Sequence, residues 1–334
     1  MRALLYRGTG QDTDHPDWGQ DVSHQSLTKD SASCLEPANA KLNLGLKVLS
    51  RRQDGFHDLL GVFQTVSLGD TVRVTLEAEI TLDCSDPALP AGPQNLAWRA
   101  ADLYRSQTGT SGCHIELTKR IPAGAGLGGG SADAAAVLRG LDRLSDRPLG
   151  LSRLVELGAH LGSDVPFAVG GGTSLVEGRG ERLLPLTWAT PPGWWCVLVC
   201  PPEPVPTAWA YAELARRRPH GVLSNPSSYA TLIGSARGGC LHADRLWPVL
   251  ENDFQPLVED TKPIVARASQ LLADTDPLAQ SMSGSGSTVY GIYDDRNAAR
   301  RAETILRGTE YPVFLCTPVP GLIDAVGQGE ADNE

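Results

Sequence analysis

Pro122-Ala-Gly-Ala-Gly-Leu-Gly-Gly-Gly-Ser131 is the stretch around which the rest of this sequence can be interpreted, and it contains five glycines. It follows an alternating pattern at 114–121, typical of a strand, and precedes apolar residues at helical spacing over 131–144. Glycines let backbone N–H groups surround an anion without interference from Cβ, and a helix N-terminus adds unpaired donors and a positive dipole end. The stretch therefore predicts a polyphosphate site, with a loop built only for tight packing as the alternative.

The common phosphate motifs do not fit this loop. Gly124, Gly126 and Gly129 satisfy G-x-G-x-x-G, but a dinucleotide site needs a strand-terminal acidic residue about 20 positions further on, where residues 144–149 form a helix end and a turn. No Gly-Lys-Ser/Thr closes a Walker A loop, and the chain has no His-Arg-Asp loop of a protein kinase. The loop predicts a phosphate cradle of another kind.

Length and charge limit the possible classes of protein. A chain of 334 residues is long for one core and predicts two domains. A net charge of -10 disfavours nucleic acid and acidic lipid as partners, and no apolar stretch approaches the roughly 18 residues of a membrane span. Seven scattered cysteines without a Cys-x-x-Cys pair predict reduced thiols in a cytoplasmic protein. Residues 1–33 carry five aspartates and no apolar block, so we expect a disordered extension or an over-called start, not a signal peptide.

Hydrophobic spacing predicts the elements of the first half. Alternation over 41–48 predicts a half-buried strand whose non-core face carries Lys41 and Asn43. We also expect a turn at 51–55, a strand at 71–76 and a helix at 95–104. Ser152 is the expected N-cap of a helix that ends at Gly162, and 164–166 is expected to be a loop because the residue before proline avoids the helical region.

In the second half, Pro191-Pro192-Gly193 predicts a domain boundary, and the apolar run 194–200 predicts a buried strand. Residues 216–239 are rich in Arg, Ser, Gly and Pro and predict a long surface loop. Helices are expected at 262–272 and 297–306, and a Ser/Gly turn at 283–287 leads into a strand at 288–292.

Several motifs in one order resemble a known kinase superfamily. Pro122–Ala132 resembles the Pro-x-x-x-Gly-Leu-Gly-Ser-Ser loop of the galactokinase, homoserine kinase, mevalonate kinase and phosphomevalonate kinase (GHMP) superfamily. Within it, the chain is most similar to the 4-diphosphocytidyl-2-C-methyl-D-erythritol kinases. That similarity extends over about 36–316 and rests on Ala40–Leu44, Arg52–His57, Gly126–Asp133, Gly162–Pro166 and Met282–Thr288, with Asn252-Asp253 upstream of the last.

The resemblance implies an α+β fold of two domains with the active site in the cleft between them. It implies a ribosomal-protein-S5-domain-2-like, ATP-binding domain at 34–190 and a ferredoxin-like α/β sandwich at 191–317. Residues 318–334 are expected to be a flexible acidic tail.

The implied activity is ATP-dependent phosphorylation, with Mg²⁺, of the 2-hydroxyl of 4-diphosphocytidyl-2-C-methyl-D-erythritol in isoprenoid precursor synthesis. Asp164 matches the catalytic aspartate and Lys41 its paired lysine, and the Ser131 hydroxyl is a candidate Mg²⁺ ligand. The residues implied to hold ATP are Pro122, Ala123, Gly124, Ala125, Gly126, Leu127, Gly128, Gly129, Gly130, Ser131 and Ala132. Those implied to bind the substrate are Asn43, Phe56, His57, Thr207, Tyr211, Gly284, Ser285 and Gly286.

The sequence departs from the family pattern at three positions. Ala132 replaces a frequent second serine, Phe56 a frequent tyrosine and Asn39 a frequent proline. Two alternatives stay open at this point: a superfamily kinase that acts on homoserine or mevalonate, and a nucleotide-binding relative without catalysis. We expect a monomer or a homodimer.

Overall fold

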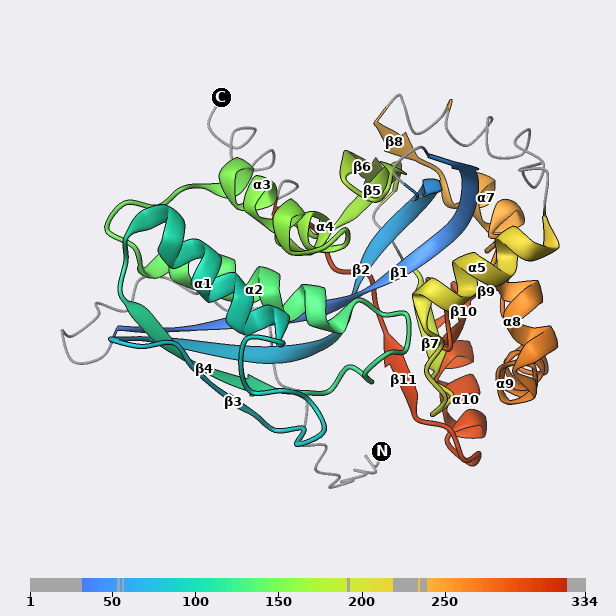
Figure 1. Ribbon diagram of the computed structural model, residues 1–334. Helices are drawn as coiled ribbons and strands as arrows, with labels where there is room; N and C mark the ends of the chain where they lie inside the picture. Colours follow the sequence, from blue (N-terminus) through green and yellow to red (C-terminus); the bar gives the residue numbers. More distant parts are fainter. Residues whose placement is uncertain are drawn as a thin grey trace, which may run out of the picture.

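Two long antiparallel strands run through both parts of the molecule (Figure 1). The computed structural model describes residues 32–52, 55, 57–190, 193–218, 234 and 239–322. Strands β1 (Ser33–Arg51) and β2 (His57–Glu77) are 19 and 21 residues long. Between their ends lie β-bulge-type register shifts, which let strands of this length bend from one part into the other.

The larger sheet has the order β3-β4-β2-β5-β6-β8, with β1 paired to the other edge of β2. The C-terminal half of β2 pairs with β4, and its N-terminal half pairs with β5. The other elements here are β3 (Thr81–Cys84), α1 (Leu96–Thr108), β4 (Gly112–Thr118), α2 (Gly129–Leu144), α3 (Leu151–Leu161), α4 (Val165–Gly170), β5 (Thr173–Gly178), β6 (Arg182–Trp188) and β8 (Cys240–Leu241).

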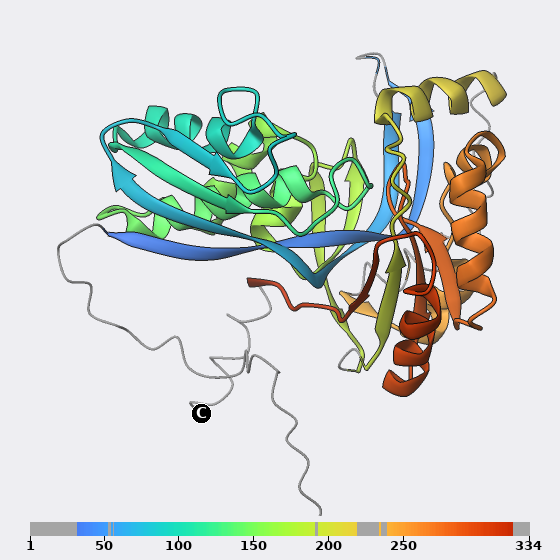
Figure 2. The same cartoon turned by 90° about the horizontal axis from the view of Figure 1, so that it is seen from below.

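The smaller sheet is antiparallel, with the order β11-β7-β10-β9. Figure 2 shows it turned across the direction of the large sheet, with helices along its outer side. Its elements are β7 (Trp195–Val199), α5 (Thr207–Arg217), α7 (Ala243–Leu246), the 3-10 helix η1 (Trp247–Val249), α8 (Gln255–Thr261), α9 (Pro263–Ala273), β9 (Ala279–Met282), β10 (Val289–Tyr293), α10 (Arg296–Leu306) and β11 (Val313–Cys316).

The continuous apolar run of β7 is explained by burial on both faces. Val197 and Val199 pack into a core with α9 and α10, whereas Cys196 and Leu198 pack into a second core with Leu42 of β1. A strand covered on both sides needs no polar alternation. This shared layer joins the two parts of the molecule.

Most predicted elements are confirmed. The expected helices at 95–104, 131–144, 262–272 and 297–306 correspond to α1, α2, α9 and α10. The expected strands at 71–76, 114–121, 194–200 and 288–292 correspond to parts of β2, β4, β7 and β10, although β4 ends at Thr118 and 119–121 is not strand. In α2 the apolar residues Ala134, Val137, Leu138 and Leu141, which recur at helical spacing, are buried, and the helix packs on β1 and β2 of the large sheet. The predicted α+β class is confirmed.

Three local predictions are wrong. The N-cap of α3 is Gly150, so Ser152 lies inside the helix. Residues 164–166 are not a loop: Asp164 is the N-cap of α4, and Pro166 lies in its first turn, where a missing N–H costs nothing because those amides have no acceptor. The face of β1 that carries Lys41 is also buried, because the glycine loop covers it.

Some predictions fall outside the described residues. These are residues 1–31 of the expected extension 1–33, residues 323–334 of the expected tail 318–334, Pro191-Pro192 of the expected boundary, and Phe56. The described start of the tail is instead held to the fold, because the Val319 amide donates to the Thr65 carbonyl at 2.8 Å and Gly321 bridges to Gly171. Of the expected loop 216–239, residues 216–217 end α5, and only 218, 234 and 239 are otherwise described. Within the described part of the chain, no helix combines the length and apolarity needed to span a membrane.

Candidate active site

The glycine loop connects β4 to α2 and is fixed from two sides. The carbonyl of Leu127 accepts the Lys41 amide of β1 at 3.0 Å, and the carbonyl of Ala125 accepts the Thr288 amide at 3.1 Å. The Ser283 hydroxyl donates to the Gly126 carbonyl at 3.0 Å. The first glycine loop therefore lies directly against the second one at 283–286.

Glycine is required at two positions of this loop. Gly126 has a φ of +79°, and a Cβ there would lie 2.2 Å from the Ser283 carbonyl oxygen. Gly128 is the left-handed N-cap of α2 and has no side chain to close the helix end, so the first N–H groups of α2 stay available to an anion. This geometry supports the predicted phosphate cradle.

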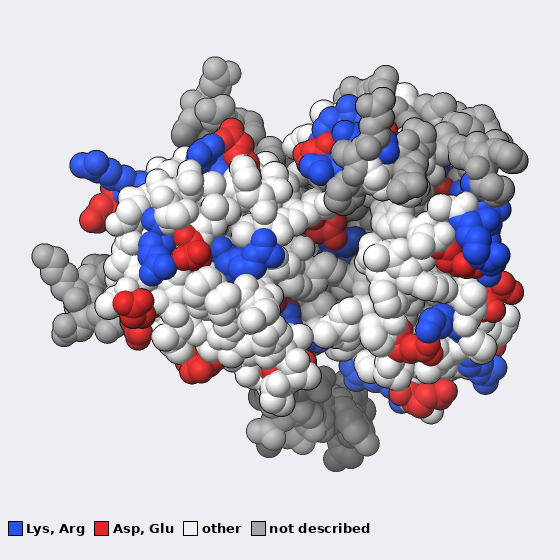
Figure 3. Space-filling model, in the orientation of Figure 1, with Lys and Arg blue, Asp and Glu red and all other residues white. Residues whose placement is uncertain are grey.

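A cavity of about 500 Å³ opens beside the loop. Figure 3 shows the surface hollowed between the two halves of the molecule. Residues predicted from the sequence line much of it: Lys41, Asn43, Pro122 to Ser131, Asp164, Thr207, Tyr211, Gly284 and Ser285. Residues that the sequence did not single out complete the lining: Leu46, Leu59, Phe63, Leu89, Pro90, Gln94, Asn95, Leu96, Lys119, Ile121, Asp133, Val205 and Phe254. Ala132 and Gly286 are not part of the lining.

Lys41 and Asp164 come together at the centre of the cavity. The Lys41 Nζ lies 3.5 Å from Asp164 Oδ2, donates to Asn43 Oδ1 and lies 4.6 Å from the centre of the Phe63 ring. The lysine side chain is 9% exposed and the aspartate side chain 32%. A fixed ammonium beside a partly open carboxylate can orient a hydroxyl and accept its proton.

Aromatic rings form one wall of the cavity. Tyr211 of α5 stacks on His57 with ring centres 5.2 Å apart and planes 21° apart, and it meets Phe254 edge-on at 4.9 Å. Burial, and then the charge of Asp164, raises the pKa of the Tyr211 hydroxyl, so the phenol stays neutral. His57 does not itself line the cavity but supports the ring that does. This wall suits a flat base.

A buried ionic cluster below the loop was not predicted. Lys119 Nζ donates to Asp133 Oδ2 at 2.6 Å and to Asp70, whose other oxygen accepts the Ile121 amide at 2.8 Å. Burial raises the pKa of Asp133 to about 7, because it outweighs the attraction of Lys119, and the charge of Asp70 adds to the rise. One signal was present in the sequence: Asp133 is a charge in the first turns of the otherwise apolar helix 131–144.

The described residues contain no group of three or more His, Cys, Asp or Glu side chains that could hold a metal ion. Mg²⁺ does not require such a cage, because it is commonly held by substrate phosphates and one or two protein groups. Ser131 and Asp164 line the same cavity, so the donor set fits an ion held mainly through phosphate.

Comparisons with known proteins extend this picture. The GHMP kinases N terminal domain family matches residues 95–172, and the GHMP kinases C terminal family matches residues 241–312. A 4-diphosphocytidyl-2-C-methyl-D-erythritol kinase from Geobacter sp. is 40% identical over 275 residues, which cover 81% of this chain and 94% of the relative. One from Gloeobacter violaceus is 39% identical over 282 residues, which cover 84% and 92%.

A solved structure agrees with these relatives. A crystal structure of 4-(cytidine 5'-diphospho)-2C-methyl-D-erythritol kinase superposes with a TM-score of 0.68 at 33% identity, and the match covers 86% of this chain and 100% of that one. Identity at this level over nearly the full length of the relatives shows the family. This chain belongs to the 4-diphosphocytidyl-2-C-methyl-D-erythritol kinase family of GHMP kinases.

Proposed function

We propose that this chain transfers the γ-phosphoryl group of ATP to the 2-hydroxyl of 4-diphosphocytidyl-2-C-methyl-D-erythritol, in the non-mevalonate synthesis of isoprenoid precursors. One observation carries the proposal: the Lys41–Asp164 pair, 3.5 Å apart, shares one cavity with a phosphate-type glycine loop and a stacked aromatic wall. The loop suits a nucleoside triphosphate, and the wall suits a substrate that carries a base.

The two ends of the cavity divide the substrates between them. The phosphates of ATP would lie against the loop amides and the start of α2, with the nucleoside toward the lining residues Leu89, Pro90 and Gln94 to Leu96. The cytosine would then stack on Tyr211, which leaves the methylerythritol hydroxyls next to Asp164. Mg²⁺, held by the phosphates with Ser131, would supply further charge neutralisation when bound.

The chemistry at the centre needs a base and a fixed cation. Asp164 accepts the proton of the 2-hydroxyl while the hydroxyl oxygen forms a bond to the γ-phosphorus of ATP. The bond between that phosphorus and the β,γ-bridging oxygen breaks, which releases ADP. Lys41 holds the acceptor oxygen by a hydrogen bond and favours its deprotonation. Asn43 and the Phe63 ring fix the lysine, so its ammonium does not have to reorganise during the reaction.

Two further features bear on the expected cellular location and on the expected partners. All seven cysteines are free thiols, which supports a reducing, cytoplasmic location. Acidic and basic side chains are interspersed on the face drawn in Figure 3, and the net charge of -10 disfavours nucleic acid as a partner.

An acceptor panel tests the proposal. ADP release is measured with ATP, Mg²⁺ and each of three alcohols: 4-diphosphocytidyl-2-C-methyl-D-erythritol, homoserine and mevalonate. We expect turnover with the first alone, and none with the Asp164→Asn variant. Turnover with homoserine or mevalonate instead would overturn the substrate, and ATP binding without transfer to any of them would overturn the activity.

A further inference from the structure

Residues 251–253, which precede Phe254 and α8, are bonded to β1 and do not line the cavity. The Leu46 amide of β1 donates to the Glu251 carbonyl at 2.7 Å, and the Asp253 amide donates back to the Leu46 carbonyl at 2.9 Å. Leu46 and Asn252 thus form an isolated parallel bridge, where the register of β1 against β2 shifts. Residues 251–253 are therefore held to β1, which fixes the backbone from which the side chains of Asn252 and Asp253 project.

Asn252 reaches toward the phosphate end of the cavity. Its Nδ2 donates to the carbonyls of Met282 at 2.6 Å and Gly284 at 2.8 Å, and its Oδ1 accepts the Phe254 amide at 2.9 Å. Asn252 is 5% exposed, so water could not easily replace its amide as the hydrogen-bond donor to these two carbonyls. Asn252 therefore sets the position of the second glycine loop, where Gly284 lines the cavity.

Asp253 reaches toward the aromatic end. Its Oδ2 accepts the Val48 amide at 3.0 Å and Arg218 Nη1 at 3.2 Å, and its Oδ1 accepts Lys47 Nζ at 3.4 Å. Arg218 is the C-cap of α5, the helix that carries Tyr211. The aspartate side chain is 3% exposed, so it holds a desolvated charge that depends on these donors.

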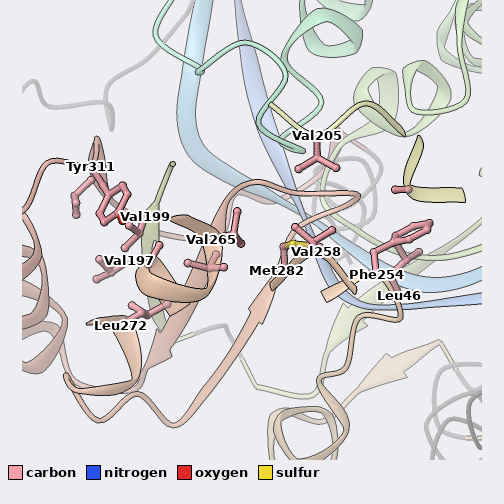
Figure 4. Close-up of a cluster of buried hydrophobic side chains, with 14 of the residues drawn as sticks. Leu46, Val197, Val199, Val205, Phe254, Val258, Val265, Leu272, Met282 and Tyr311 are labelled. Atoms are coloured by element: carbon pink, nitrogen blue, oxygen red, sulfur yellow. The ribbon is translucent and has the colours of Figure 1, made fainter. Parts of the chain in front are cut away.

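The two side chains together join the two ends of the acceptor site. Phe254, next in the chain, packs edge-on against Tyr211, and Figure 4 draws it with Leu46 and Met282 in one buried cluster. A shift of this segment would move the second glycine loop and the aromatic wall relative to each other. The distance between the reacting hydroxyl and the stacked base of a substrate has to match that separation.

We propose that Asn252 and Asp253 are positioning residues that set the spacing between the phosphoryl-transfer point and the base-stacking wall, and thereby the preference for an acceptor carrying a cytidine diphosphate group. The proposal rests on the proposed function. Asn252 fixes the glycine-loop end and Asp253 fixes α5 at the wall end. Neither side chain lines the cavity, so both act through the elements they hold. Because Asp253 fixes the wall end, its replacement should affect the binding of the base-bearing acceptor and not the binding of ATP.

The test compares two variants, Asp253→Asn and Arg218→Ala, each of which removes the ion pair between Asp253 and Arg218. Arg218→Ala changes the partly exposed partner, so the buried Asp253 carboxylate keeps its other hydrogen-bond donors. Loss of one charge-assisted hydrogen bond predicts about a tenfold rise in the KM for 4-diphosphocytidyl-2-C-methyl-D-erythritol and in the inhibition constant of cytidine diphosphate. The KM for ATP should stay within about twofold and kcat within about threefold. Arg218→Lys should restore most of the loss.

Glu251→Gln is the matched control. Glu251 also pairs with Lys47, but its side chain is 60% exposed and does not contact α5 in the described structure, so wild-type constants are expected. Unchanged cytidine diphosphate inhibition in both Asp253→Asn and Arg218→Ala would overturn the inference, as would an equal rise in the KM for ATP, which indicates general structural damage. A wild-type enzyme that does not phosphorylate the substrate would instead refute the proposed function itself.

Discussion

Replacement of Gly126 by alanine tests the contact between the two glycine loops. The new Cβ would lie 2.2 Å from the Ser283 carbonyl oxygen and 2.9 Å from that of Gly286, and both neighbours are backbone atoms that cannot rotate away. The residue also has a φ of +79°, which L-residues with a side chain rarely adopt. The variant must therefore push the loops apart and strain its own backbone.

The expected cost follows from these two effects. A left-handed conformation costs a non-glycine residue about 1–2 kcal/mol, and separation of the loops loses the Ser283 to Gly126 hydrogen bond, worth about 1 kcal/mol. The sum of about 2–3 kcal/mol predicts a fall in melting temperature of about 3–4 °C for a chain of 334 residues. Because the loop amides would lose their arrangement, the KM for ATP should rise about tenfold or more.

Gly130→Ala supplies the control for stability. Its Cβ would meet only Leu96 Cδ1 at 3.6 Å, which is an ordinary contact, and the residue is in the first turn of α2. Alanine is a better helix former than glycine, so the melting temperature should equal or exceed that of the wild type. Melting is followed by circular dichroism at 222 nm, a wavelength at which helices dominate the signal. Equal melting temperatures of the two variants would refute the described contact between the loops.

Three further perturbations address the centre, the wall and the ionic cluster. Lys41→Met should lower kcat by about 100-fold or more with a small effect on the KM for ATP, because it removes the fixed cation beside Asp164. A coupled assay of ADP release measures kcat, and a value near that of the wild type would contradict the role of Lys41. Tyr211→Ala should raise the KM for the cytidine-bearing acceptor about tenfold, whereas Tyr211→Phe, which keeps the ring, should leave it within about twofold. The pKa of Asp133 is about 7 in the folded protein against 3.8 ordinarily, so its favourable contribution is present at low pH and is lost as pH rises through 7. The melting temperature of Asp133→Asn minus that of the wild type should therefore increase from pH 4 to pH 8, and a decrease over this range would show that Asp133 is instead stabilised in its charged form.

Local patterns predicted the elements that local physics determines. Period-two and 3.6-residue spacing located β4 and α1, because each buries one face against a neighbour. From the sequence we expect the face of β1 that carries Lys41 and Asn43 to be exposed. Alternation indicates only that the two faces differ, and it does not indicate which later segments pack on the polar one. In the folded chain, Lys41 and Lys47 are both buried, the first against the glycine loop and the second against Asp253.

Long-range partners explain what the sequence could not predict. Lys119 meets Asp70 across 49 residues of chain and Asp133 across 14. The stacking of His57 on Tyr211 joins β2 to α5, and no spacing rule connects these two segments. The motifs nevertheless assign Lys41, Asp164, Tyr211 and Pro122 to Ser131 to one site, and the structure brings these residues to one cavity. Their chemical roles stay predictions.

The position of the transferred phosphate on the product is the sharpest test of the proposed reaction. The protein is incubated with ATP, Mg²⁺ and 4-diphosphocytidyl-2-C-methyl-D-erythritol, and the product is examined by ³¹P and ¹³C nuclear magnetic resonance, with Asp164→Asn as the control. We expect one ADP for each product molecule, a new phosphate monoester on carbon 2, and no product from the control. A phosphate on any other hydroxyl, or ADP formed without a phosphorylated alcohol, would contradict it.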